Sequence, residues 1–431
     1  MNEIAFVPRW LQGQLDLALR TLPVVVLTGA RQTGKSTLAR HLMPERRYLT
    51  LDDLDVLDQA RREPDSLLVN PPVTLDEVQR APELLLAIKR RVDKERSPGD
   101  FLLTGSAQFS LMRDVADSLA GRAVYLDLPP FCPLEWQGSD TAADLFDCLF
   151  ADTLDFSPWN KSAASDAWRQ WVLRGGLAPA LQCHEDDARG LWLGGYVQTY
   201  LERDLRDLCN VGSLPDFQHL MQVAAQRTGR LLNQAEVARD AGLSHPTCHR
   251  YLNLLETGCQ IERTMPFAAN PTVALVKSPR LFWRDSGVAS WLAGIHDGAS
   301  LEKRSDLGFW LEQAVFQTLQ SWRACDPFRR RLRYWRTRSG AEVDFVLEQD
   351  QRIVAMEVKA GGRIGLGDVA GLRQFIEAQG RKAKSIRAIA LYGGDEVRFF
   401  GDNIAALPYR SIFPATARRR CVNKVVQTTI S

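Results

Sequence analysis

The sequence predicts an α/β protein in which two sheet-containing parts flank a helical middle. Short apolar strands alternate with helical stretches over residues 1–137, which is typical of a parallel sheet. The pattern turns helical from residue 168, and near the C-terminus a helix is followed by three strands, a helix and another strand. A chain of 431 residues is also too long for one ordinary core, so we expect several domains.

The composition restricts the class of protein before any motif is considered. Apolar residues make up 45% and charged residues 25% of the chain, and the formal net charge of +2 argues against a uniformly basic nucleic-acid coat. The eight cysteines form no CxxC pair, which indicates neither a zinc ribbon nor a disulfide framework. Because we find no signal sequence and no apolar run near the roughly 18–20 residues of a membrane helix, we expect a cytoplasmic protein with no membrane partner.

The first domain is expected to span residues 1–137. Its buried strands are predicted at 23–28, 72–75 and 100–104, and a helix begins at Lys35. The following stretch, 138–167, is rich in Asp, Ser, Ala and Thr, which predicts a linker or an irregular insertion.

The middle domain, residues 168–300, contains a predicted helix-turn-helix. Helices at 233–241 and 244–255 flank the turn Gly242-Leu243, and the Ser244 side chain is placed to cap the second helix. Short strands at 260–265 and 279–283 are expected for the wing of a winged helix.

The third domain is expected at residues 301–414, followed by a basic tail at 415–431. Its element order is the core order of the restriction-endonuclease-like fold. The predicted elements are a helix at 308–322, strands at 332–338, 342–348 and 352–359, a helix at 366–379, and strands at 386–392 and 396–400.

A strand that runs into GxxxxGK[S/T] and then a helix is a strong signal for a phosphate-binding loop. Backbone N–H groups curl around the phosphates, and the helix N-terminus adds positive potential. We expect Lys35 to reach the β- and γ-phosphates of ATP and the Ser36 hydroxyl to ligate Mg²⁺. The predicted nucleotide-binding residues of this segment are Gly29, Ala30, Arg31, Gln32, Thr33, Gly34, Lys35, Ser36 and Thr37.

Two acids follow the strand that ends at Leu75. Asp76 is expected to hold Mg²⁺ through water, and Glu77 to polarise the attacking water as a general base. The alternative is that both acids only begin a helix, where carboxylates suit the dipole. The P-loop upstream favours the first interpretation.

Two further positions complete the predicted nucleotide site. Ser106 or Thr104, at the end of the next strand, is a candidate sensor of the γ-phosphate, or else a helix cap. Arg122 is either a source of positive charge for the transition state or a surface arginine.

At these residues the chain resembles the AAA-type ATPases that carry the domain of unknown function 4143. The resemblance includes the P-loop, Asp76-Glu77-Val78-Gln79, Thr104-Gly105-Ser106 and 119–122, and it continues in 200–204, Asp285-Ser286-Gly287 and the C-terminal Glu-Val-Asp and Glu-Val-Lys. The family more often has Pro at Ala30 and Thr at Ser36. The resemblance implies an ATPase module, a winged-helix middle and a nuclease-like end.

The C-terminal motifs match the metal-site pattern of PD-(D/E)xK nucleases. Glu357 and Lys359 are two apart on a predicted strand and therefore share a face, and Asp344 lies on the preceding strand. Asp344 and Glu357 would hold Mg²⁺ and Lys359 would orient or deprotonate the attacking water, with Glu312 as an additional helix carboxylate. The alternative is a strand face with ordinary charges.

Two other segments are candidates for contact with nucleic acid. Residues 329–338 contain six arginines with Tyr334 and Trp335, which suits phosphates and stacked bases, or else a charged edge strand that discourages sheet pairing. The second helix of the helix-turn-helix offers mainly His245, His249 and Arg250, so DNA contact and a structural role both remain open.

The sequence therefore predicts an ATPase that acts on nucleic acid, with DNA favoured, through a Mg²⁺-dependent nuclease-like domain. The alternative is an ATP-dependent switch whose nuclease-like domain is inactive and docks DNA or a protein partner. A homo-oligomer is a further expectation, since an arginine supplied by a neighbour would require assembly.

Overall fold

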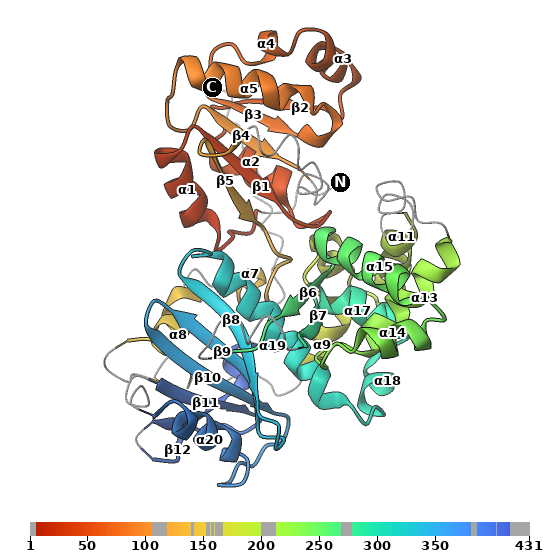
Figure 1. Ribbon diagram of the computed structural model, residues 1–431, viewed down its shortest axis with the longest axis vertical. Coiled ribbons are helices and arrows are strands. Elements are labelled where there is room, and N and C mark those ends of the chain that lie inside the picture. The colour runs from red at the N-terminus through yellow and green to blue at the C-terminus, as the bar shows by residue number, and fades with distance from the viewer. Residues whose placement is uncertain are drawn as a thin grey trace, which may run out of the picture.

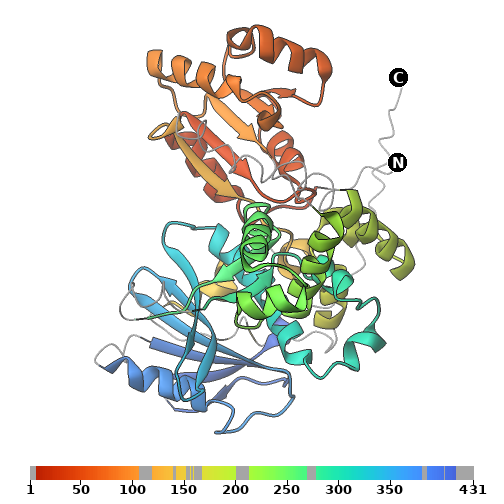
Figure 2. The ribbon, with the colours of Figure 1, turned by 45° about the vertical axis from the view of Figure 1, so that its right-hand side comes forward.

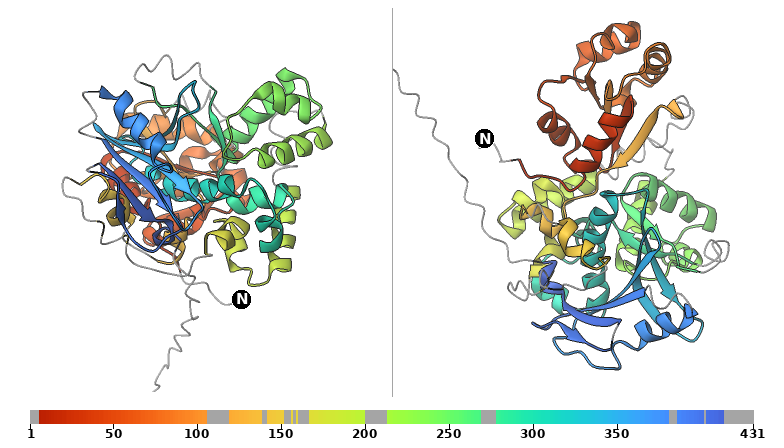
Figure 3. Two further views of the ribbon diagram at one scale, coloured as in Figure 1. Left: turned by 90° about the horizontal axis from the view of Figure 1, so that it is seen from below. Right: turned by 90° about the vertical axis from the view of Figure 1, so that its left-hand side faces the viewer.

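The computed structural model describes residues 6–105, 119–138, 142–151, 156, 159, 167–199, 213–268, 278–380, 386–401 and 403–413. The N-terminal domain stands above the joined middle and C-terminal regions in Figure 1, in Figure 2 and in the right panel of Figure 3. In Figure 1 the middle helices lie at the lower right and the C-terminal sheet at the lower left. The candidate motifs at Ser106, at 200–204 and in the tail 415–431 lie outside the described residues.

The N-terminal domain contains a five-stranded parallel sheet in the order β2-β3-β4-β1-β5. The prediction of a parallel α/β sheet is confirmed, although two of its strands, β2 and β5, are not evident from the sequence pattern. The strands are β1 (Val24–Thr28), β2 (Arg47–Thr50), β3 (Val73–Asp76), β4 (Phe101–Thr104) and β5 (Ala123–Asp127).

Helices cover both faces of this sheet, so its central strands are buried on both sides and read as apolar runs. One apolar cluster lies against α1 (Gln12–Thr21) and α2 (Lys35–Leu42). The other lies against α3 (Leu54–Arg62), α4 (Pro64–Leu67) and α5 (Glu83–Lys94). The 3₁₀ turn η1 (Val78–Arg80) follows β3.

The middle region is helical with one small antiparallel ribbon. The predicted helix-turn-helix corresponds to α14 (Gln234–Asp240) and α15 (His245–Thr257), and the Ser244 side chain accepts from the N–H of Thr247 as predicted. The ribbon pairs β6 (Ile261–Thr264) with β7 (Arg280–Trp283). The other helices are α9 (Ala167–Arg174), α10 (Ala178–Gln182), α11 (Asp186–Tyr196), α13 (Leu214–Gln226), α17 (Ser286–Leu292) and α18 (Gly298–Glu302).

The C-terminal region contains a six-stranded sheet in the order β12-β13-β11-β10-β9-β8. A long helix, α19 (Leu307–Ala324), packs on one face and α20 (Ala370–Ala378) on the other. The helix, three strands, helix and strand agree with the predicted element order, whereas β13 is not evident from the sequence pattern. The strands are β8 (Arg330–Arg336), β9 (Glu342–Gln349), β10 (Arg352–Lys359), β11 (Ile386–Tyr392), β12 (Arg398–Phe399) and β13 (Ile404–Pro408), and η7 (Tyr409–Ser411) follows.

The described residues of the segment 138–167 pack into the core. They include α8 (Ala142–Asp147), and α7 (Pro133–Trp136) precedes the segment. Phe150 stacks on Trp322 of α19, and Trp159 is fully buried. Of the two alternatives that the sequence left open, a linker or an insertion, these contacts favour the insertion.

A row of buried glutamines on α19 connects the middle region with the end of the N-terminal domain. Gln313 bonds both the N–H and the C=O of Trp283, and Gln317 accepts from the N–H of Ser286 and donates to the C=O of Phe131. Gln320 donates to the C=O of Arg284. Because a buried polar group costs free energy when left unpaired, these bonds specify how β7 lies along α19.

Candidate nucleotide site and C-terminal carboxylate cluster

The predicted phosphate-binding loop lies between β1 and α2. Gly29 has φ +141°, and a Cβ at this position would lie 2.5 Å from the carbonyl oxygen of Leu128. Gly34, with φ +92°, precedes the first residue of α2. Glycine is required at Gly29 both for its backbone conformation and for the close approach of the neighbouring chain.

Lys35 is buried at the first position of α2. Its Nζ atom donates to the carbonyl oxygens of Gly29 at 3.0 Å and Ala30 at 2.8 Å. Burial lowers the pKa of the ammonium below its ordinary 10.5, while Glu77 and Asp76 act to raise it. The ammonium of Lys35 is thus hydrogen-bonded only to neutral carbonyl oxygens of its own loop in the bonds described here. Phosphate oxygens, which are charged, can replace these carbonyls as hydrogen-bond acceptors.

Asp76 is the centre of a hydrogen-bonded group beneath the loop. Its Oδ1 accepts from Ser36 Oγ at 3.1 Å and from Thr104 Oγ1, and its Oδ2 accepts from the Tyr48 hydroxyl. Burial raises the pKa of Tyr48 to about 12. The structure brings together the two predicted Mg²⁺ residues, Ser36 and Asp76, and their oxygen chemistry fits that ion.

Glu77 directly follows β3 in the left-handed region, with φ +58°. Its carboxylate accepts from the side-chain amide of Gln79, and burial raises its pKa above the ordinary 4.5. Both features are consistent with a carboxylate aimed at a reacting group.

Arg122 does not belong to this site within its own chain. It directly precedes β5, whose Ala123 pairs with Val24, whereas the phosphate loop leaves the opposite end of β1. Five strand residues separate the two ends, roughly 16 Å at 3.3 Å per residue. Arg122 instead pairs with Asp93 at 2.6 Å, which within one chain favours the alternative of a surface arginine.

Two arginines that the sequence pattern does not reveal lie beside the phosphate loop. Buried Arg9 donates to the carbonyl oxygen of Thr33 at 2.8 Å and pairs with Glu135 at 3.2 Å. Arg284, from the end of β7, pairs with Asp127 at the end of β5 at 2.6 Å. Neither lies in a recognisable motif: Arg9 bonds the loop itself, whereas Arg284 bonds Asp127, which pairs with Thr28 at the end of β1.

The predicted C-terminal residues lie near one another, but around an arginine. Arg280 of β7 bonds Glu312 of α19 through Nη2 and Asp344 of β9 through Nη1, the latter at 3.2 Å. Glu357 pairs with Lys359 at 2.6 Å. In the described part of the chain, no group of three or more His, Cys, Asp or Glu side chains is arranged to hold a metal ion. The predicted three-carboxylate metal site is thus not formed in this conformation.

Burial strongly affects this cluster. It raises the pKa of Glu312 to about 8, with Asp344 adding to the effect and Arg280 opposing it. It also raises the pKa of Glu357 to about 7 against the effect of Lys359, and Glu357 Oε2 is buried without a hydrogen-bond partner. The cluster therefore holds more carboxylates than its arginine and lysine neutralise.

The arginine-rich strand β8 does not present the base-stacking surface that its aromatic residues predicted. Tyr334 and Trp335 are buried and cannot stack on bases. Arg330 pairs with Asp147 at 2.8 Å and Arg333 with Glu348 at 2.8 Å. Much of the run serves the fold, although Arg331 remains exposed.

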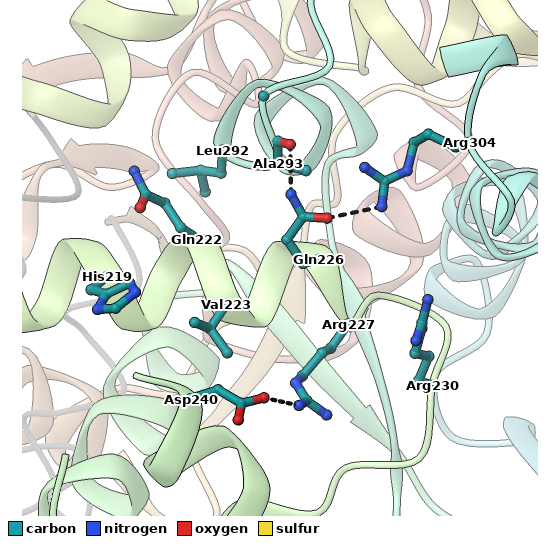
Figure 4. Close-up of a pocket in the computed structure, with 11 residues that line it drawn as sticks. His219, Gln222, Val223, Gln226, Arg227, Arg230, Asp240, Leu292, Ala293 and Arg304 are labelled. Carbon is teal, nitrogen blue, oxygen red and sulfur yellow. Dashed lines mark hydrogen bonds and ion pairs between the residues drawn. The ribbon is translucent and has the colours of Figure 1, made fainter. Parts of the chain in front are cut away.

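A cavity of about 630 Å³ lies in the middle region (Figure 4). Three arginines line it, but Arg227 pairs with Glu236 and Asp240, while Arg230 and Arg304 both pair with Asp306. Their charges are satisfied by these acids, so this cavity offers no uncompensated charge to a ligand. The separate exposed start of α15 presents His245, His249 and Arg250.

No helix among the described residues combines the length and the apolar character needed to cross a bilayer.

Three family models match the chain. An AAA domain covers residues 21–136, the domain of unknown function DUF8612 covers 165–299, and the domain of unknown function DUF4143 covers 307–412. The fold and the P-loop thus belong to the class of AAA-type ATPase domains, a similarity that supports ATP binding. The AAA domain and the domain of unknown function 4143 implied by the sequence resemblance are both present.

Two curated relatives are uncharacterized proteins, Rv2008c of Mycobacterium tuberculosis and Mb2031c of Mycobacterium bovis. Each is 32% identical to the chain over 351 residues, which covers 80% of this chain and 72% of the relative. The chain belongs to the same family as these mycobacterial proteins.

Solved structures show weaker similarity. The Walker-type ATPase PABY2304 of Pyrococcus abyssi is 16% identical and covers 65% of this chain and 94% of its own, with a TM-score of 0.42. The STAND protein PH0952 of Pyrococcus horikoshii, with a tetratricopeptide repeat sensor, is 12% identical. The match covers 74% of this chain and 49% of PH0952, with a TM-score of 0.23. We draw nothing further from these two similarities.

Proposed function

We propose that the protein binds and hydrolyses Mg²⁺-ATP at the loop between β1 and α2. The observation that carries this proposal is the 3.1 Å hydrogen bond between Ser36 Oγ and Asp76 Oδ1, directly beneath the buried Lys35. Mg²⁺, when bound, supplies charge neutralisation for the phosphates. Ser36 and Asp76 are the residues that would hold it.

The other residues act through charge and position. The Lys35 ammonium exchanges its loop carbonyls for phosphate oxygens, and Glu77 orients water and accepts its proton. Thr104 holds Asp76 and thereby positions it. Ser106 remains a proposed sensor of the γ-phosphate.

For the C-terminal domain, we favour the ATP-dependent switch with a docking role for DNA or a protein partner. Arg280 neutralises Glu312 and Asp344, and the carboxylates of Glu312, Asp344 and Glu357 belong to residues no more than 8% exposed. A phosphodiester has no access to carboxylates in such a closed arrangement.

A Mg²⁺-dependent nuclease acting on DNA is the second candidate. It is supported by the placement of Asp344 beside β10, where its Oδ2 accepts from the N–H of Val358 at 2.8 Å, between Glu357 and Lys359. The two functions differ in whether metal-dependent cleavage exists at all.

The test is an assay of ATP hydrolysis and of DNA cleavage by the purified chain. Linear, single-stranded and four-way-junction DNA are incubated with Mg²⁺, with and without ATP, beside Lys35→Ala and Asp344→Ala. ATP hydrolysis that requires Lys35, without cleavage of any DNA, is the expected result. Cleavage that requires Asp344 would replace the switch by the nuclease, and absence of ATP hydrolysis would overturn the first proposal.

A further inference from the structure

A buried chain of hydrogen bonds leads from Lys35 to the segment that precedes α1. The carbonyl oxygen of Ala30 accepts from Lys35 Nζ at 2.8 Å and from the hydroxyl of Thr33 at 3.0 Å. The carbonyl oxygen of Thr33 in turn accepts from Nη1 of Arg9 at 2.8 Å. Arg9, Thr33 and Lys35 are each no more than 6% exposed, so water does not weaken these bonds.

Arg9 bonds two further segments besides the phosphate loop. Its Nη2 atom donates to the carbonyl oxygen of Pro129 at 2.7 Å, and its Nε atom pairs with Glu135 Oε1 at 3.2 Å. The guanidinium carbon also lies 4.0 Å from the centre of the Phe131 ring. Arginine suits this position because it presents five N–H donors in a fixed fork, whereas the ammonium of a lysine is a single compact donor group.

Glu135 continues the chain of bonds to α19. Its carboxylate accepts from the N–H groups of Trp10 at 2.8 Å and Cys132 at 3.1 Å. It also accepts from the hydroxyl of Ser321, on α19, at 3.4 Å. The long helix of the C-terminal region is therefore bonded to the same acid that pairs with Arg9.

The apolar contacts of the N-terminal segment lie on both sides of Arg9. Val7 packs into the apolar cluster of the middle and C-terminal regions, whereas Leu11 packs into the cluster that lies against α1 and α2. Arg9 is thus on the short stretch that crosses from one part of the molecule to the other. A shift of the phosphate loop relative to α7 and α19 would change the bonds of Arg9.

The ion pair between Arg9 and Glu135 is too deeply buried to be explained by stability alone. Both side chains are 2% exposed, and the removal of two charges from water costs about as much as their attraction recovers. A buried pair can instead specify one arrangement of the segments that it joins. Here those segments are the phosphate loop, α7 and α19.

We propose that Arg9 is a positioning residue of the phosphate loop and that it transmits the state of this loop to α19. In the present conformation Lys35 bonds the carbonyl oxygen of Ala30, and phosphate oxygens would take the lysine from this partner. A bound phosphate then holds the loop from one side while Arg9 holds it from the other, so the bonds at Glu135 and Ser321 open less often. The inference rests on the proposed binding of ATP and identifies how the switch would begin.

The inference is tested by hydrogen exchange of the full-length chain, measured by mass spectrometry with and without a saturating non-hydrolysable ATP analogue. The reporter is the end of α19, residues 318–324, and α20, on the other face of the C-terminal sheet, reports the general stabilisation by the ligand. Wild type, Arg9→Met and Arg9→Lys are compared. Arg46→Met is the matched control, because Arg46 is also buried and donates to the carbonyl oxygens of Gly99 and Val73 within the N-terminal domain.

The analogue should slow exchange at 318–324 by at least about 5-fold more than in α20, both in wild type and in Arg46→Met. Arg9→Met should bind the analogue and lose this difference, because methionine bonds neither Thr33 nor Glu135. Arg9→Lys keeps the charge without the fork, so we expect a smaller difference than in wild type. This variant also serves if Arg9→Met does not fold.

Bound analogue without this difference in wild type, or the same difference in Arg9→Met, would overturn the inference. Failure of both variants to fold would also overturn it, because Arg9 would then serve the fold alone. Binding is measured by calorimetry on the same samples. Absence of binding to wild type would overturn the proposed ATP binding and this inference with it, whereas binding without a response of α19 would overturn the inference alone.

Discussion

The Nη2 atom of Arg284 lies 2.6 Å from Oδ2 of Asp127, although the two residues are 157 positions apart and come from different regions of the chain. Asp127 pairs in register with Thr28, the residue before the phosphate loop. This ion pair therefore links the middle region to the strand end beside the nucleotide site, and the Tyr196 hydroxyl of α11 adds a hydrogen bond to the carbonyl oxygen of Arg31 in the loop. Four residues earlier, Arg280 of β7 pairs with Asp344, so β7 and the residue after it connect the C-terminal carboxylates with the strand end beside the nucleotide site.

We expect Asp127→Asn to lower the free energy of unfolding by about 1–3 kcal/mol. Removal of one partner of a buried pair typically costs about 3–5 kcal/mol, and the loss is smaller here because the side chain of Asp127 is 44% exposed. Urea unfolding followed by tryptophan fluorescence measures it. Asp93→Asn, which breaks the exposed pair with Arg122, is the control and should have little effect. Equal losses in both variants would show that the Arg284 pair has no special role.

Lys35→Ala should weaken ATP binding roughly 10- to 150-fold, because a hydrogen bond to a charged group contributes about 1.5–3 kcal/mol. Calorimetric titration with a non-hydrolysable ATP analogue measures the change. Arg122→Ala should bind as wild type does, since Arg122 lies at the other end of the sheet. Weaker binding by Arg122→Ala in the monomer would contradict this placement.

Glu77→Gln should keep ATP binding and slow hydrolysis by about 10²–10⁴-fold, the usual contribution of a general base. Phosphate release and analogue binding are measured on the same preparation. Because burial raises the pKa of Glu77 and a base must be ionised, the acid limb of the wild-type rate should lie above pH 4.5. Loss of binding together with hydrolysis would assign Glu77 a structural role instead.

Gly29→Ala should destabilise the protein by about 1–3 kcal/mol, the usual cost of a residue held in an unfavourable backbone region. Its new Cβ would also meet the carbonyl oxygen of Leu128. Gly13→Ala is the matched control, because Gly13 lies in α1 with no atom within 4 Å of a new Cβ. That change should stabilise by about 0.5–1 kcal/mol. Thermal unfolding that ranks the two variants in the opposite order would contradict the loop geometry.

The cluster at Glu357 should make stability depend on pH near neutrality. Burial raises the pKa of Glu357 from 4.5 to about 7, so the folded state binds this proton more tightly than the unfolded state. The resulting stabilisation is complete below about pH 4.5 and is lost as the pH rises through about 7. The advantage of wild type over Glu357→Gln should thus fall by about 3 kcal/mol across this window, at 1.36 kcal/mol per unit. Urea unfolding in the presence of EDTA tests it, and a constant difference between the two proteins would refute it.

Local patterns were sufficient for several parts of the structure. The P-loop, the acids Asp76 and Glu77, the cap at Ser244 and the C-terminal element order are all evident from the sequence. Each depends on residues close together along the chain, where strand and helix periodicity and capping chemistry act. The sequence does not show which side chains are exposed. Tyr334 and Trp335 were expected to stack on bases, but both are buried in the core.

By itself the sequence determined the nucleotide-binding loop and the order of strands and helices, because glycine conformation and apolar periodicity are local properties. Only the tertiary structure decided that Arg122 lies at the opposite end of the sheet from the phosphate loop, that Arg9 bonds this loop, that Arg284 pairs with Asp127, and that Arg280 pairs with the C-terminal carboxylates. The physical reason is that a buried charge requires a partner, but nothing in the local sequence specifies which distant residue provides it.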